Sequence, residues 1–434
     1  MMEILAITIL FGCFLLLLFL GVPICFAIGI ATLLSVMTML PFETSLILIA
    51  QRLSTGLKSF SLLAIPFFIL AGVLMNQGGI ARRLINFSQV LVGTLPGSLA
   101  HVNIMANMLF GSISGSGAAS AAAVGSIISP VQKKEGYNPA FSAAVNAASC
   151  PVGLLIPPSN VMIVYALTSG SVSIAALFMA GYLPGILMGL CLMAVTAWIA
   201  AGRHYPRNKR PPVQTIFRAF LEAMPCLSLI IIVMGGILSG IFTATEASAF
   251  AVAYSFILAF FIYREITIKQ LPSIILESVI TTSIVLLLVA VSVSMSWALT
   301  SADLPNLIST HLLKLSDNPI LIILAINLLL LFIGTFMDMT PAVLVFTPIF
   351  LPIATELGMS PLHFGIMMIF NLCIGLITPP VGNALFIGCS VGKVDIHQVI
   401  RPMLPFYVVL FLLLMIISFV PQISLFLPHL FGLN

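Results

Sequence analysis

The sequence has very little charge. Of its 434 residues, 16 are Lys or Arg and 12 are Asp or Glu, so charged residues make up 6% of the chain. Ordinary soluble domains carry roughly 25%. Hydrophobic residues make up 61%. Such a chain cannot cover a water-exposed surface with charge, which excludes a soluble catalytic domain and predicts an integral membrane protein.

Strictly alternating apolar residues are also absent. A transmembrane β-barrel needs that alternation, whereas the apolar runs of this chain are continuous. The basic residues occur in small dispersed groups, which argues against a nucleic-acid partner, and the seven cysteines form no CxxC pair. Because a spanning helix takes about 20 apolar residues, the length allows on the order of 10 to 12 spans. We therefore expect an all-α polytopic membrane protein embedded in the lipid bilayer.

The apolar runs place these spans. The first run, from Ile4 to about Leu40, is too long for one helix and is expected to turn near Pro23. The capping box from Thr243 to Glu246 predicts the start of another helix. Further spans are expected at about 61–80, 139–168, 175–201, 223–241, 244–263, 275–300, 361–390 and 403–427.

Two more apolar stretches, at about 103–131 and 319–351, are interrupted in their middles by Gly, Ser, Thr and Pro. If each stretch enters and leaves on the same side, about 13 Lys and Arg lie on the side of the basic 203–222 linker and about 3 on the other. Basic loops mark the cytoplasmic side of membrane proteins. The charges therefore predict a cytoplasmic linker and two re-entrant hairpins.

The two halves of the chain share their Gly and Pro spacing. At an offset of 222 residues Gly153 falls on Gly375, and the Pro157-Pro158 pair falls on Pro379-Pro380. Each half, 1–202 and 223–434, would contain about five spans and one re-entrant hairpin, so an odd number of crossings inverts the second half. Inverted repeats with paired interruptions are typical of secondary transporters. We expect the hairpins at 103–131 and 319–351 and the broken helices at 139–168 and 361–390 to meet near the membrane centre.

The interruptions carry the residues that could bind a solute. Non-helical backbone within a bilayer is tolerated where it lines a polar cavity, where free carbonyls suit small cations and half-helix N-termini attract anions. Lys and Arg are absent from these segments, so an anion would be held by helix dipoles, hydroxyls and co-bound cations. Asp338 could instead be solvated in a vestibule or cap a half-helix. We assign substrate binding to Ser114, Ser116, Asn160, Asp338, Thr340 and Asn383.

With these features the chain resembles the large membrane subunit of the tripartite ATP-independent periplasmic (TRAP) transporters, over essentially its whole length. Where that family commonly has proline in an FTPTEA stretch, this chain has Ala244. The motifs that carry the resemblance are the Gly/Ser-rich 111–117 tip, Gly136-Tyr137, Ile156-Pro-Pro-Ser159, Phe242-Thr-Ala-Thr-Glu246-Ala247 and Thr378-Pro-Pro-Val-Gly382.

The resemblance implies a multi-pass protein of the bacterial inner membrane that imports a carboxylate-bearing solute by sodium symport. It implies an elevator movement of a transport domain against a scaffold, and a periplasmic substrate-binding protein as partner. A small four-helix membrane subunit is expected on a separate chain, since the first hairpin begins at residue 4. No cofactor is expected besides sodium ions. The first candidate sodium site is Gly334, Gly375, Thr378 and Val381, and the repeat gives a second at Ser112, Gly153, Ile156 and Ser159.

Other functions fit parts of the pattern. A stand-alone cation-coupled dicarboxylate transporter would share the hairpins and broken helices without needing a binding protein. A passive channel would explain the spans alone. An intramembrane serine protease could use Ser116 with His101 or His363 as base, although the inverted repeat would then have no explanation. Transport without enzymatic activity is the leading interpretation.

Overall fold

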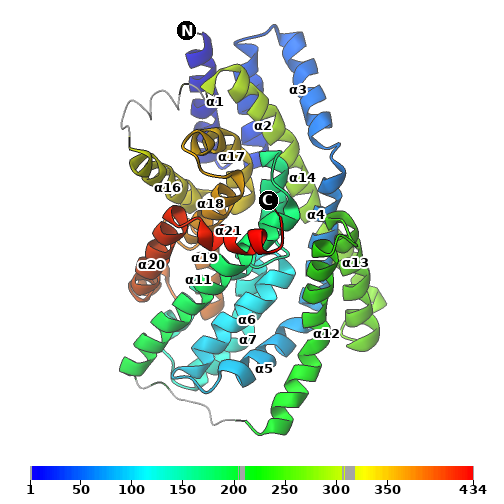
Figure 1. Ribbon diagram of the computed structural model, residues 1–434, viewed down its shortest axis with the longest axis vertical. Helices are drawn as coiled ribbons and strands as arrows, with labels where there is room; N and C mark the ends of the chain where they lie inside the picture. The colour runs from blue at the N-terminus through cyan, green and yellow to red at the C-terminus, as the bar shows by residue number, and fades with distance from the viewer. Residues whose placement is uncertain (1, 204, 206–210, 305–306, 308–317, 434) are drawn as a thin grey trace.

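The chain folds into a bundle of helices. The computed structural model describes residues 2–203, 205, 211–304, 307 and 318–433, and this part contains no strand (Figure 1). Its first half consists of α1 (Met2–Phe19), α2 (Ile24–Met37), α3 (Phe42–Gly56), η1 (Phe60–Leu63), α4 (Ala64–Gln77), α5 (Ile80–Val92), α6 (Ser98–Ser114), α7 (Gly117–Lys134), α8 (Pro139–Ser149), α9 (Val152–Leu155), α10 (Asn160–Ser169) and α11 (Ile174–Arg203).

The second half has a comparable series of helices. They are α12 (Val213–Leu238), α13 (Ala244–Phe256), η2 (Ile257–Ile262), η3 (Ile268–Gln270), α14 (Leu271–Ser301), α16 (Pro319–Phe336), α17 (Met339–Glu356), α18 (Pro361–Gly375), α19 (Asn383–Gly392), α20 (Ile396–Phe419) and α21 (Gln422–Leu430). The predicted capping box is present, because the Thr243 side chain accepts from the Glu246 amide and the Glu246 carboxylate accepts from the Thr243 amide.

Eight helices of the described residues are long and apolar enough to cross a bilayer, and α8 to α10 add a ninth span with a bend of 48°. The prediction of a polytopic helical membrane protein is therefore confirmed. Both arms of the second predicted hairpin, α16 and α17, are among the eight by length and composition. Length alone thus does not distinguish a re-entrant hairpin from two spans.

Several predicted boundaries were wrong. The helices α3 and α5 were not predicted, because they are short and mix polar residues with apolar ones. The expected span at 403–427 is two helices, α20 and α21, separated at Val420 and Pro421. The helix α12 begins at Val213, so the second part of the 203–222 linker is helical. Outside the described residues lie 204 and 206–210 of that linker. The segment 308–317, with His311 and Lys314, also lies outside them.

The two halves interlock around the predicted interruptions. The short helix α10 packs against α17 and α18 of the second half, and α19 packs against α7 and α8 of the first. The Tyr165 hydroxyl on α10 donates to the Pro361 carbonyl at the start of α18, at 2.6 Å. The helix α4 packs against both α13 and α14 on another side of the molecule. Each interruption thus faces a helix pair from the opposite half.

Buried amides hold the broken helices to the first arm of each hairpin. The Asn107 side chain on α6 donates to Ser149 on α8 at 2.8 Å, and Asn371 on α18 donates to Asn327 on α16 at 2.9 Å. Polar side chains in an apolar bundle need such partners, since an unpaired amide there is costly. These bonds fix the register of helices whose other contacts are non-directional.

Candidate functional site

Both hairpin tips are short turns that end in a capped helix. The helix α6 ends at Ser114, Gly115 turns with a φ of 62°, and the Ser116 hydroxyl accepts from the Ala119 amide of α7 at 3.2 Å. At the other tip Asp338 Oδ1 accepts from the Met339 amide of α17 at 2.9 Å. Asp338 therefore does cap a half-helix, one of the roles that the sequence left open.

Both broken helices are interrupted at the tandem prolines. The peptide bonds Pro157-Pro158 and Pro379-Pro380 are cis. Between α9 and α10 the chain runs through 156–159, and between α18 and α19 it runs through 376–382. The new helices begin at Asn160 and Asn383, and no side chain caps either of them within the described residues.

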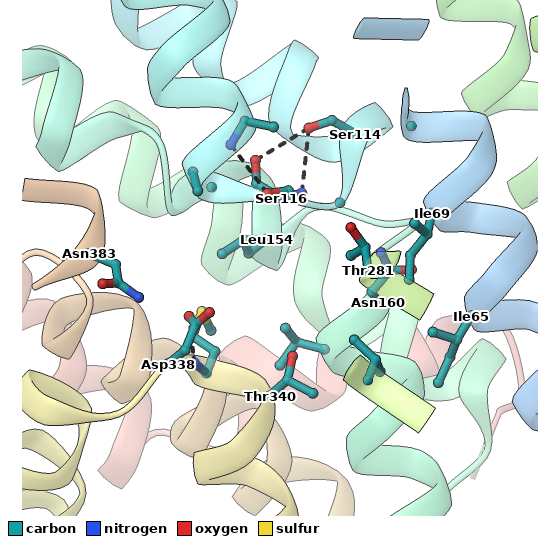
Figure 2. Close-up of a pocket in the computed structure, with 18 of the residues that line it drawn as sticks. Ile65, Ile69, Ser114, Ser116, Leu154, Asn160, Thr281, Asp338, Thr340 and Asn383 are labelled. Carbon is teal, nitrogen blue, oxygen red and sulfur yellow. Dashed lines mark hydrogen bonds between the residues drawn. The ribbon is translucent and has the colours of Figure 1, made fainter. Parts of the chain in front are cut away.

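Tips and breaks surround one cavity with a volume of about 280 Å³. Figure 2 shows Ser114 and Ser116 of the first tip on one side of it and Asp338 and Thr340 of the second tip on the other. The cavity brings together all six residues predicted to bind substrate: Ser114, Ser116, Asn160, Asp338, Thr340 and Asn383.

Four helix N-termini converge on this cavity. The first residues of α7, α10, α17 and α19 all line it, and they are Gly117, Asn160, Met339 and Asn383. Each helix N-terminus carries unpaired amide groups and the positive end of the helix dipole, both of which favour an anion. No side chain caps the starts of α10 and α19, although the Ala384 amide on the first turn of α19 donates to the Leu376 carbonyl at 3.1 Å. The positive ends of four helix dipoles therefore lie at the wall of the cavity.

The side chains around the cavity supply negative charge only. Within the described part of the chain, its lining contains the carboxylates of Asp338 and Glu277 and neither Lys nor Arg. The Glu277 carboxylate accepts from the side-chain amide of Gln77 at 3.1 Å. An anion in this cavity would meet helix dipoles and two carboxylates, a balance that bound cations would improve.

Three polar lining residues were not predicted. Asn76 comes from α4, and Glu277 and Thr281 come from α14. An acid inside the predicted 275–300 span was a signal, since ionisable residues in spans are commonly functional. Nothing in the sequence indicates that α4 and α14 face the hairpin tips, since this depends on packing between distant helices. Gly72 on α4 lies close to the first hairpin tip, because a Cβ added there would lie 2.7 Å from the Ser114 carbonyl oxygen.

The residues of the first candidate sodium site lie behind the cavity rather than in its lining. Gly334 and Gly375 touch through their backbones, since a Cβ added at Gly334 would lie 3.1 Å from the Gly375 Cα atom. The Thr378 amide donates to the Gly375 carbonyl at 2.9 Å, and its hydroxyl donates to Ile374 at 2.6 Å. Val381 is exposed. The amide of Gly382, the residue after Val381, donates to the Thr335 carbonyl at 3.2 Å, so this end of the break also lies next to Gly334.

The second candidate site has a similar backbone contact. A Cβ added at Gly111 would lie 2.8 Å from the Gly153 Cα atom, and one added at Gly153 would lie 2.7 Å from the Ser112 amide nitrogen. The Ser112 hydroxyl donates to Leu109 at 2.9 Å. Ile156 has an extended backbone. Ser159 is 1% exposed, and its hydroxyl has no hydrogen-bond partner among the described residues.

The histidines lie away from the cavity. His101 and His363 are buried in α6 and α18, and neither lines the cavity. His363 Nε2 lies 3.2 Å from the Ser418 carbonyl oxygen. No His of the described residues therefore stands beside Ser116 as a base, which removes the geometric support for a serine protease. Those residues also contain no cluster of three His, Cys, Asp or Glu that could hold a metal.

Comparison with known proteins identifies the family. Residues 11–423 match the family described as "Tripartite ATP-independent periplasmic transporter, DctM component". The Salmonella typhimurium protein YgiK is 58% identical, with 98% of each chain covered. The Vibrio cholerae protein named "Sialic acid TRAP transporter large permease protein SiaM" is 39% identical, with 96% of each chain covered.

A solved structure has a similar fold. It is that of the Alcanivorax borkumensis YdaH transporter, with a TM-score of 0.64, 14% identity and 90% of each chain covered. Together with the candidate spans, these matches describe a multi-pass protein of the bacterial inner membrane that acts in transport. The chain belongs to the DctM family, the large permease component of the tripartite ATP-independent periplasmic transporters.

Proposed function

We propose that this permease imports a carboxylate-bearing organic solute by sodium symport. The observation that carries the proposal is the convergence of four helix N-termini on a cavity lined by no basic side chain of the described residues. Such a site suits a carboxylate, which can accept from several backbone amides at once. The relative SiaM is named for sialic acid, an organic acid.

The charge balance of the cavity supports sodium coupling. The carboxylates of Asp338 and Glu277 line the same cavity as the helix N-termini, so an incoming anion would be repelled unless cations entered with it. The glycine contacts at Gly334 and Gly375, and at Gly111 and Gly153, bring backbone close together behind the cavity. Carbonyl and hydroxyl oxygens are the ligands that small hard cations prefer. We therefore retain both candidate sodium sites.

The buried hydroxyl of Ser159 supports the second of these sites. A hydroxyl without a hydrogen-bond partner in an apolar interior is unfavourable, unless a ligand completes it. Ser159 directly precedes the uncapped start of α10, so an ion at its Oγ atom would lie beside the substrate cavity. Sodium bound there would offset the charge of a carboxylate held at Asn160.

The cavity walls also support an elevator movement. One wall comes from α4 and α14, and the other comes from the hairpin tips and the starts of α10 and α19. The contacts of α10 with α17 and of α19 with α7 would make the hairpins and the broken helices of the second wall move as one group. We infer that this group forms the transport domain and that α4 and α14 belong to the scaffold.

The proposed partners are a periplasmic substrate-binding protein and a small four-helix membrane subunit on a separate chain. The family description names a tripartite periplasmic system, which supports both. The alternative is a stand-alone cation-coupled dicarboxylate transporter. The experiment is uptake of radiolabelled organic acid into proteoliposomes containing this permease, its small subunit and its binding protein.

The choice of cation and of protein components in that experiment decides between the alternatives. We expect uptake above equilibrium with an inward sodium gradient, and none when potassium or choline replaces sodium. We also expect no uptake when either partner is omitted. Uptake in choline at the full rate would refute the coupling. Uptake at the full rate by the permease alone would refute the tripartite assignment and favour the stand-alone transporter.

A further inference from the structure

A second cavity, with a volume of about 780 Å³, opens where α11 ends. Its walls come from the α7–α8 connection, from α11 and from the α19–α20 connection. In Figure 1 the end of α11 lies at the lower left, far from the N-terminus at the top. Four basic residues line this cavity, and no acidic residue of the described chain does: Lys133, Arg203, Lys393 and Arg401.

The fold holds the Arg203 side chain in place. Arg203 lies over the Phe141 ring at 5.5 Å, and its Nη1 donates to the Tyr205 hydroxyl at 3.4 Å. Tyr205 is itself fixed, because its ring stacks on Tyr137 at 4.4 Å and its hydroxyl accepts from the Asn138 amide at 3.2 Å. The end of α11 is thereby fastened to the loop that follows α7.

Lys393 reaches the cavity through an unusual backbone conformation. It ends α19 with a φ of 51°, in the left-handed region that few residues other than glycine adopt. Its amide donates to the Ser390 carbonyl at 3.2 Å, which closes the helix. Arg401 follows on the first turns of α20. Glycine would adopt this backbone conformation with less strain, but lysine places a positive charge at the edge of the cavity.

None of these four cations forms an ion pair with a residue of the described chain. The ion pairs among the described residues are Arg83 with Glu265 and Arg218 with Glu222, and neither involves the cavity. Several like charges around one cavity repel each other, and an anion would relieve that repulsion. The cavity therefore suits a negatively charged group, which no acidic residue of the described part of the chain supplies in its lining.

The surroundings point to lipid as the source of that group. Ile199, Pro402 and Pro405 form apolar wall beneath the cations. On α11 the Trp198 side chain is 72% exposed, and on α20 Val408 is 58% exposed, so both helices that line the cavity also carry exposed apolar side chains. Exposed Trp is typical of the membrane interface, where lipid headgroups lie. Trp198 is five residues from Arg203, about 7.5 Å along the helix.

We propose that this cavity binds the phosphate of an anionic phospholipid. Lys133, Arg203, Lys393 and Arg401 contact the headgroup, and an acyl chain lies along the apolar side of α20 next to Pro405. Basic pockets between helices at the cytoplasmic membrane surface recognise such headgroups. The distribution of Lys and Arg in the sequence predicts that this side of the molecule faces the cytoplasm. The site is separate from the substrate cavity and does not depend on the proposed transport mechanism.

Native mass spectrometry of the full-length permease tests the proposal. The protein is taken from vesicles of phosphatidylcholine with phosphatidylglycerol, and the retained lipid is titrated. We expect one phosphatidylglycerol to be retained tightly. The combined Lys133→Gln, Lys393→Gln and Arg401→Gln variant should weaken it roughly a hundredfold, given the contribution of each basic residue near an anionic surface.

The matched control removes three charges that do not line the cavity. The combined Arg82→Gln, Lys134→Gln and Lys269→Gln variant has the same net charge as the test variant and should retain the lipid with unchanged affinity. A Lys133→Arg and Lys393→Arg variant keeps the charges and should also retain it, which separates lost binding from misfolding.

Three results would overturn the proposal. The first is equal lipid affinity in the test variant and the unmodified protein. The second is equal retention of phosphatidylcholine, because recognition would then not depend on charge. The third is displacement of phosphatidylglycerol by millimolar inorganic phosphate or succinate, since the cavity would then be a site for a soluble anion.

Discussion

The thiol of Cys373 lies 3.6 Å from the carbonyl oxygen of Pro151, to which it donates a hydrogen bond, and the two residues are 222 positions apart. That separation equals the offset relating the Gly and Pro residues of the two halves. A residue that touches its own repeat equivalent lies next to the axis relating the repeats. Both residues are buried, and α9 packs against α18 at this point. The two broken helices therefore cross at the centre of the molecule.

This crossing explains why one cavity collects residues from both halves. Each broken helix continues past the axis into a short helix that packs against the hairpin of the other half. The starts of α10 and α19 are consequently brought to the same cavity as the two hairpin tips. If the helices diverged instead, the four N-termini would face separate regions.

Replacing Ser159 by Ala should weaken sodium binding without loosening the fold. The Ser159 hydroxyl has no partner among the described residues, so its removal breaks no hydrogen bond there. We expect the sodium concentration for half-maximal uptake to rise about tenfold, the change that loss of one favourable ion contact produces. The measurement is the sodium dependence of uptake in proteoliposomes.

The matched control is Ser142→Ala. Ser142 on α8 is also buried with an unpartnered hydroxyl, but it belongs to neither candidate sodium site. Its variant should keep the sodium dependence of the unmodified protein. Equal behaviour of the two variants would remove Ser159 from the sodium site.

Changing Asn160 or Asn383 to Asp should weaken substrate binding. Each residue is the first of a helix that points its N-terminus at the cavity, and a carboxylate there repels an anion while favouring the helix dipole. We expect the KM for the organic acid to rise at least about tenfold. The melting temperature should be unchanged or slightly higher.

The control for charge at a helix start is Asn318→Asp. Asn318 caps α16 by accepting from the Ile320 amide and does not line the cavity. Aspartate can accept the same bond, so uptake should be unaffected. A normal KM in both cavity variants would show that helix N-termini do not bind the solute.

Replacing Gly375 by Ala should destabilise the protein. A Cβ at this position would lie 2.6 Å from the Gly334 carbonyl carbon, and backbone on both sides leaves little room to adjust. We expect a loss of roughly 1 to 3 kcal/mol in the free energy of unfolding, the usual cost of overpacking. Thermal unfolding of the purified protein in detergent measures it as a lower melting temperature.

Gly235→Ala provides the comparison for that loss. Gly235 is inside α12, and a Cβ added there meets no atom of the described structure within 4 Å. Since Ala favours a helix more than Gly does, this variant should be as stable as the parent or more so. A Gly375→Ala protein of unchanged melting temperature would contradict the close contact.

Replacing Gly72 by Ala should slow transport more than it destabilises the protein. The new methyl group would lie 2.7 Å from the Ser114 carbonyl oxygen and push the first hairpin tip away from α4. If the hairpin tip slides past α4 during transport, the conformation in which Gly72 touches Ser114 becomes less populated in the variant. We expect a lower maximal uptake rate with at most a small change in melting temperature.

The control for this substitution is Gly29→Ala on α2. A Cβ there would meet Val291 at 3.4 Å, an ordinary contact, away from the cavity. Its uptake rate should match that of the parent. The proposed sliding contact would be wrong if Gly72→Ala transported at the parent rate.

Much of the architecture could be predicted because it follows from local chemistry. Apolar runs specify helices in lipid, where backbone groups must pair within the segment. Glycines and tandem prolines mark where those helices stop, and the hairpin tips and breaks lie at these residues. The capping box at Thr243 is local as well. The helices α3 and α5 were missed, since their mixed polar and apolar residues do not form a continuous hydrophobic run.

The sequence by itself determined that this protein is embedded in the membrane, where its helices break, and which six polar residues of these breaks line the central cavity. Only the tertiary structure decided which surfaces face each other. The position of Glu277 and Thr281 in the cavity wall, and the meeting of Lys133 with Arg401, depend on packing between distant helices. The physical reason is that helix formation depends on neighbours in the chain, whereas a binding site depends on neighbours in space.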